Sequence, residues 1–131
     1  MQDNHERLLM NWSIGKLLVE AQGGMNRAKY GDGLIKEWSK KLSEVYGNAY
    51  QKEFLRRYRK FYITFPKSST VSSLSWSHVV KILLLNNENE RKYYINQVIL
   101  NHLSVRELRE MIKNKTYDRL SYIDKELLDR L

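Results

Sequence analysis

The chain has 131 residues, of which 42% are hydrophobic and 11% aromatic, and its formal net charge is +8 at pH 7. This length and hydrophobic content predict a single folded domain over residues 1–131 and exclude a disordered chain. The absence of cysteine excludes a disulfide framework and a thiolate metal site. The chain begins with a polar segment of mixed charge, and its apolar runs are too short to cross a bilayer. We therefore expect a cytoplasmic protein with no membrane partner.

Two helices are predicted ahead of the most basic segment. The first runs from Asn4 to Gln22, and the glycine pair at 23–24 ends it. The second follows Asp32 and ends before Gly47. In the first helix we expect Leu8, Trp12, Leu18 and Val19 to face inward. In the second, the apolar side chains recur at helical spacing, namely Leu34, Ile35, Trp38, Leu42, Val45 and Tyr46.

Residues 51–65 form a third predicted helix, which Pro66 closes. It carries five basic residues against one acidic residue, so its net charge of +4 is half that of the chain. Its apolar face is predicted to hold Phe54, Tyr58, Phe61 and Phe65, and its opposite face Lys52, Arg56, Arg59 and Lys60. A helix that is apolar on one side and cationic on the other suits a polyanion, most commonly nucleic acid.

The turn before the basic helix is predicted at residues 47–49. A helix, a short turn and a basic helix give the outline of a helix-turn-helix, in which the second helix enters the major groove of DNA. Any antiparallel helical pair joined by a glycine-containing turn has the same outline. We therefore predict a helix-turn-helix-like pair in the basic half, residues 1–66.

A polar segment, residues 67–73, is predicted to link this half to a second helical half, residues 74–131. Two helices are predicted at 75–85 and 88–101. A third begins at the capping box that Ser104 opens, and a fourth spans 121–130, with Ser121 as a possible cap. The fold class is all-α, a compact bundle of six or seven helices. The role of the second half is left open.

Residues that would carry catalysis or bind a metal are scarce. The three histidines have no partner of ligand type at helical spacing, and His78 is expected to cap a helix end. The sequence Asp124-Lys125-Glu126 lies in a helical pattern, whereas a PD-(D/E)xK nuclease site needs strands. We therefore expect no enzymatic activity, no metal and no cofactor.

Seven short motifs connect the chain to a known family. They are WSIGKLL (12–18), RAKYGDGLI (27–35), FLRRYRKFYITFP (54–66), LSWSH (74–78), ERKYY (90–94), SVREL (104–108) and YDRL (117–120). In this order and spacing, over residues 8–120, the chain resembles the amino-terminal domain of the YhcG family, which usually precedes a PD-(D/E)xK nuclease domain. It departs from the family's G-x-G-F-S turn, since Ala49 replaces a glycine and Gln51 replaces the serine at the start of the basic helix.

The resemblance implies a DNA-binding module of a nuclease-type protein without its nuclease domain. The chain would be an excised domain or a short stand-alone relative, with a mobile element as one possible source. In this hypothesis the basic helix contacts duplex DNA, and flanking residues bind phosphates. The predicted contacts are Lys52, Arg56, Arg59 and Lys60 on the helix, with Lys40, Lys41, Arg27 and Lys29 beside it.

Two other functions remain open from the sequence. The main alternative is a protein-interaction module, for example an inhibitor or adaptor from a mobile element that docks on an acidic protein surface. The third is a metal-dependent nuclease, retained only because of the family's usual partner domain. A protein partner, or a nuclease domain in trans, is compatible with the first two hypotheses, and the sequence does not give the oligomeric state.

Overall fold

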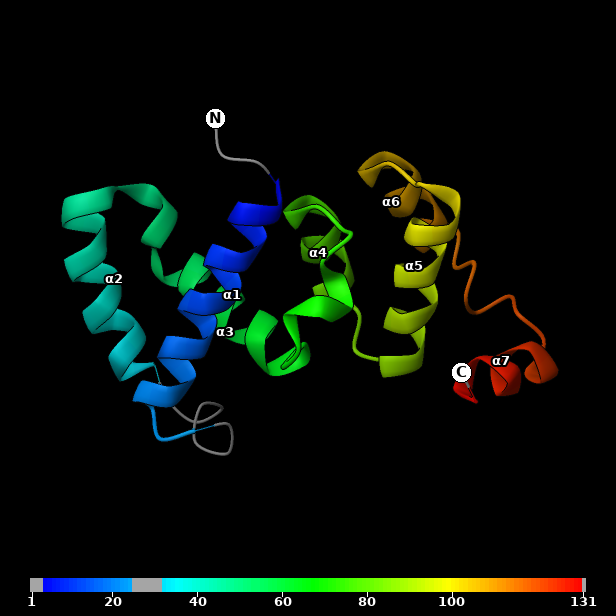
Figure 1. The fold of residues 1–131 in the computed structure, drawn as a ribbon, viewed down its shortest axis with the longest axis horizontal. Coiled ribbons are helices and arrows are strands. Elements are labelled where there is room, and N and C mark those ends of the chain that lie inside the picture. The colour runs from blue at the N-terminus through cyan, green and yellow to red at the C-terminus, as the bar shows by residue number, and fades with distance from the viewer. Residues whose placement is uncertain (1–3, 25–31, 131) are drawn as a thin grey trace. The chain divides into compact units, whose positions relative to one another are not determined.

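The computed structural model describes residues 4–24 and 32–130, and in this part of the chain it is all-helical, without strands (Figure 1). The chain divides into two units, Met1–Thr70 and Val71–Leu131. The helices are α1 (Asn4–Ala21), α2 (Gly33–Tyr46), α3 (Lys52–Thr64), α4 (Trp76–Leu83), α5 (Glu88–Asn101), α6 (Val105–Lys113) and α7 (Tyr122–Asp129). The predicted all-α fold, with seven helices, is confirmed.

The core of the first unit lies between α1 and α3, which pack along each other more extensively than any other pair of helices described. Their approach is close because Gly15 of α1 has no side chain: a Cβ atom there would overlap the carbonyl oxygen of Tyr58 on α3. The fully or almost fully buried side chains of this core are Leu8, Leu18 and Val19 from α1 and Leu55, Tyr58 and Phe61 from α3. The two helices thereby form a tightly packed pair.

The ends of α1 and α3 follow the sequence closely. Gly23 and Gly24 both have positive φ, and their amides donate to the carbonyls of Glu20 and Val19, as expected where glycines end a helix. The indole Nε1 of Trp12 donates to the carbonyl oxygen of Phe65 at 2.8 Å, just after the last residue of α3. Trp12 is half-buried, in edge contact with Tyr62.

The connection between α2 and α3 is longer than predicted. It spans residues 47–51 and contains a 3₁₀ turn, Asn48–Tyr50, in place of a three-residue turn at 47–49. Gly47 enters it with φ of 87°, a conformation that favours glycine. The amides of Tyr50 and Gln51 donate to the carbonyls of Gly47 and Asn48, so the turn satisfies its own backbone groups.

Helix α2 is less buried than its apolar pattern predicts. Only Ile35 and Ser39 are buried, while Leu34, Trp38 and Leu42 are half-buried. At the end of the apolar stripe, Val45 and Tyr46 are 71% and 67% exposed. The periodicity identified the apolar stripe correctly, but the described residues of this chain cover only its edge.

The second unit is organised by caps and one buried tyrosine cluster. His78 accepts the Ser75 amide in a capping box that opens α4, and its Nε2 lies 2.8 Å from the carbonyl oxygen of Leu103, which confirms its predicted capping role. Tyr94 on α5 is almost fully buried, and its hydroxyl accepts the amide of Tyr117. The capping box at Ser104 and the Ser121 cap of α7 are also as predicted.

The segment predicted as a linker has structure of its own. Ser68–Val71 forms a 3₁₀ turn, and Val71 is fully buried. The boundary between the two units falls inside this segment, between Thr70 and Val71. The segment therefore contributes to packing as well as to connection.

Candidate nucleic-acid interface

The basic helix α3 shows one side to the core and one to solvent. Leu55, Tyr58 and Phe61 are buried against the rest of the unit, and the Tyr58 hydroxyl donates to the carbonyl oxygen of Ala49 at 3.1 Å. Phe54, which was predicted to face inward, is half exposed, and the guanidinium of Arg57 lies 5.8 Å from its ring centroid. With its inner side anchored, α3 holds its outer cations in a defined row.

Two of the four predicted contacts on α3, Lys52 and Lys60, are exposed to solvent. They lie eight residues apart, a little over two helical turns, so they stand near opposite ends of the same outer face. Side chains of this kind meet phosphates as flexible point charges. Together with Arg56, these two lysines are the accessible part of the predicted site.

The other two, Arg56 and Arg59, share one acidic partner. Arg56 binds Oδ2 of Asp32 through Nε and NH2, each at 3.0 Å, and NH2 of Arg59 binds Oδ1 at 3.2 Å. The Arg59 side chain is only 15% exposed, against 42% for Arg56. A single carboxylate thus bridges both guanidinium groups, and we call this arrangement the Asp32 clamp.

The clamp ties the start of α2 to the middle of α3. Asp32 is the residue before α2, but its side chain makes no capping hydrogen bond because it is directed to the arginines. Burial raises the pKa of this carboxyl group, while the hydrogen bonds and charges of Arg56 and Arg59 lower it, and the net direction is downward. The carboxylate therefore stays ionised at neutral pH.

No sequence pattern predicts this clamp. Its members are 24 and 27 residues apart, and a lone aspartate before a helix is typical of an N-cap. Only the packing of α2 beside α3 brings the three side chains together. Arginine binds carboxylate and phosphate groups with similar bidentate geometry.

The predicted flanking contacts are only partly placed. Lys40 and Lys41 are exposed on α2, and Lys41 pairs with Glu37 one turn away at 3.0 Å. Arg27 and Lys29 lie outside the residues that the structure describes. Within the described residues, the candidate interface therefore consists of α3 and the exposed lysines of α2.

Metal sites and membrane spans have distinct structural requirements. Residues 4–24 and 32–130 contain no group of three or more His, Cys, Asp or Glu side chains that could hold a metal ion. None of the helices in these ranges combines the length and the apolar character that a bilayer crossing requires.

Basic all-helical units occur in many protein families, and the sequence of this chain identifies its family. The chain belongs to the family described as the DUF1016 N-terminal domain, whose family model matches residues 1–119. This confirms the predicted relationship to the amino-terminal domain of the YhcG family.

One curated relative comes from Escherichia coli (strain K12) and bears the name "Putative nuclease YhcG". It is 29% identical to this chain over 140 residues, a region that covers 81% of this chain and 37% of the relative. The chain thus spans little more than a third of that protein. No solved structure matches the chain significantly.

Proposed function

We propose that the first unit is a non-catalytic DNA-binding module of a nuclease-associated protein, with α3 as the element that contacts duplex DNA. The observation that carries this proposal is α3 itself, a helix of net charge +4 whose inner side is buried and whose Lys52 and Lys60 are exposed. Such a row of cations on a rigid helix suits the phosphate backbone, which supplies most non-specific affinity. The name of the relative supports the association with a nuclease.

The helix-turn-helix interpretation belongs to the same proposal. Helices α2 and α3 are joined by residues 47–51, slightly more than the roughly three to four residues that are typical of the motif. In this interpretation α3 is the recognition helix and α2 flanks it, with Lys40 and Lys41 toward the phosphates. The Asp32 clamp then fixes the orientation of the two helices.

The test is the salt dependence of binding to a fluorescently labelled duplex, followed by anisotropy. Each phosphate contact contributes about −0.9 to the slope of log K against log salt. Four contacts, from Lys40, Lys41, Lys52 and Lys60, predict a slope near −3.6, whereas exchange of Asp32 for phosphate by both arginines as well predicts about −5.4. The measured slope therefore also reports whether the clamp opens on DNA.

Matched variants locate the contact. Lys60→Ala should reduce the slope by about one unit. Lys113→Ala, which removes an exposed lysine from the second unit, should leave it unchanged. Equal losses in the two variants would indicate attraction by net charge alone, and the absence of binding at the lowest salt would reject DNA binding for this chain.

A further inference from the structure

Helix α1 has a second apolar side that no described part of its own chain covers well. Its core side carries Leu8 and Leu18, whereas Met10, Ile14 and Leu17 lie together on another side, at spacings of four and three residues. Met10 is 39% and Leu17 56% exposed. A helix with apolar residues around most of its circumference is typically buried on more than one side.

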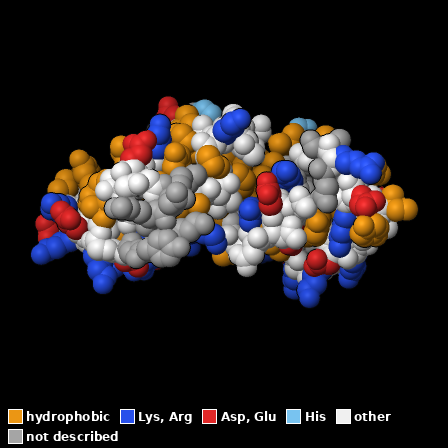
Figure 2. All heavy atoms as spheres, turned by 90° about the horizontal axis from the view of Figure 1, so that it is seen from below, with side chains coloured by type: hydrophobic (Ala, Val, Ile, Leu, Met, Phe, Trp, Pro, Cys, Tyr) orange, Lys and Arg blue, Asp and Glu red, His pale blue; other side chains and the backbone are white. Residues whose placement is uncertain are grey.

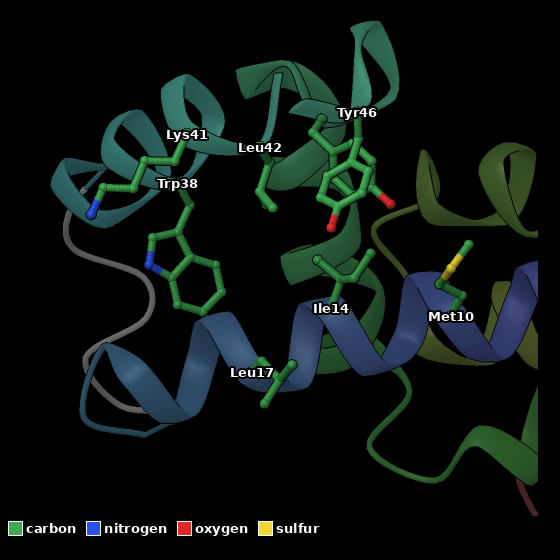
Figure 3. A pocket seen from close by; sticks show the side chains of 8 residues that line it. Met10, Ile14, Leu17, Trp38, Lys41, Leu42 and Tyr46 are labelled. Atoms are coloured by element: carbon green, nitrogen blue, oxygen red, sulfur yellow. The ribbon is translucent and has the colours of Figure 1, made fainter. Parts of the chain in front are cut away.

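Helix α2 repeats this spacing. Trp38, Leu42 and Val45 are separated by four and three residues, and Tyr46 adjoins them. Figure 3 shows Trp38 opposite Leu17, with Leu42 and Tyr46 of α2 on the side that faces α1, and the two helices run in opposite directions. The space between them is an open groove of about 530 Å³. Its lining is apolar except for Lys41, and consists of Met10, Ile14, Leu17, Trp38, Lys41, Leu42, Tyr46 and Tyr50.

We infer that this groove is a dimer interface, which the α1–α2 face of a second copy covers. Apolar residues that alternate at spacings of four and three form the seam of coiled coils and four-helix bundles. An antiparallel pair of helices with two such stripes is half of a bundle of this kind. Two copies related by a two-fold axis complete it, because the same face then serves as its own partner.

The exposed area agrees with a second copy as the occupant. Leu17, Val45 and Tyr46 are each more than half exposed, and Met10 more than a third. Since an aromatic side chain such as Tyr46 covers roughly 150–250 Å² and an aliphatic one somewhat less, these four together present on the order of 400 Å². The half-buried Ile14, Trp38 and Leu42 extend the face toward the roughly 800 Å² that each partner buries in a stable interface. Figure 2 shows that hydrophobic side chains also reach the surface elsewhere among the charged ones, so an independent control is needed.

The charge of the first unit predicts how salt affects dimerisation. Residues 4–24 and 32–70 contain eleven basic and six acidic side chains, a net charge of +5 that two copies would bring together. Salt screens this repulsion, so dimerisation should strengthen as salt rises. DNA binding should weaken over the same range, and the inference therefore does not depend on the proposed function.

The experiment is sedimentation velocity of the full chain, without DNA, from about 1 to 200 µM at low and high salt. We expect a concentration-dependent shift from 15.7 kDa to twice that mass, favoured by salt. Leu17→Glu should raise the dimer dissociation constant at least about a hundredfold, because it places charge in an apolar interface. Val45→Glu, at a 71% exposed position, should do the same with an unchanged helical circular-dichroism spectrum.

Ile123→Glu is the matched control, since Ile123 is 68% exposed on α7 of the second unit. It should leave the dimer intact. A wild-type chain that stays at 15.7 kDa at all concentrations would overturn the inference. So would a dimer that survives both groove variants, or one that only Ile123→Glu dissociates, which would move the interface to α7.

Discussion

The two sides of α1 show how one helix can be packed closely and left open at the same time. Toward α3 the helix presents Gly15, so the two backbones approach until a Cβ would not fit between them. Toward α2 the helix borders an open groove, which Trp38 and Tyr46 line from the other side. Because the side chains at a crossing decide the distance between helices, a similar apolar content gives a sealed core on one side and an accessible surface on the other.

The largest contrast is expected between two adjacent leucines of α1. Leu18 is fully buried on the α3 side, and its replacement by alanine should lower the free energy of unfolding by about 2–5 kcal/mol through lost burial and a cavity. Leu17 is 56% exposed, so Leu17→Ala should cost less than about 1 kcal/mol at concentrations where the chain is monomeric. Urea unfolding followed by tryptophan fluorescence measures the free energy of unfolding of both variants. Equal losses would contradict the difference in packing between the two sides of α1.

Gly15→Ala should give the next largest effect, with a sign opposite to the usual one. Alanine inside a helix is normally more stable than glycine by about 1 kcal/mol. Here its Cβ would overlap the Tyr58 carbonyl, and we expect a loss of about 2–3 kcal/mol because two backbones must separate.

Gly33 provides the control for this substitution. It opens α2, and a Cβ there would meet nothing within 4 Å. Gly33→Ala should therefore be neutral or stabilising by up to about 1 kcal/mol in the same thermal or urea unfolding assay. If Gly15→Ala were also stabilising, the close crossing of α1 and α3 would be refuted.

Helix ends and apolar stripes could be predicted from the sequence, whereas the burial of each stripe could not. Helix ends depend on neighbours in the chain, so the glycines after α1, the Ser104 capping box and the role of His78 were all accessible to local rules. The apolar stripe of α2 was equally visible. Whether Val45 and Tyr46 are covered depends on which other surface reaches them, and periodicity contains no information about that.

The candidate site likewise has one part that local sequence predicts and one part that depends on tertiary packing. The charge of α3 and its exposed lysines follow from composition and helical spacing. The sharing of Asp32 by two arginines follows only from tertiary packing, since the three residues belong to segments far apart in sequence. It changes the interpretation of the arginines from exposed contacts to members of an ion-paired cluster.

The Asp32 clamp gives a smaller, pH-dependent prediction for the α2–α3 junction. Because the pKa of Asp32 is lower in the folded protein than its ordinary value of 3.8, its contribution to stability is fully present above that pH. It is lost as pH falls through the lowered value. Asp32→Asn should destabilise the chain at pH 7 by no more than about 1 kcal/mol, since the pair is partly exposed and screened.

Thermal unfolding of the wild type and Asp32→Asn at a series of pH values measures the contribution of the Asp32 carboxylate to stability. The difference between them should be constant from pH 7 to about 5 and shrink at lower pH as the carboxylate is protonated. A difference that grows on acidification would show that Asp32 does not stabilise the fold as an anion.

The smallest expected effect concerns the first residue of the basic helix. Gln51 occupies the N-cap position of α3 with extended backbone angles, but its side chain makes no capping bond and instead donates to Asn48 Oδ1 at 3.1 Å. Serine in this position accepts an amide of the first helical turn, so Gln51→Ser should stabilise the unit by about 0.5–1 kcal/mol in thermal unfolding. Gln51→Ala, which removes the contact with Asn48 and adds no cap, should not stabilise it. If both variants behaved alike, the open amides at the start of α3 would be satisfied by solvent, and the cationic helix would need no cap to stay in place.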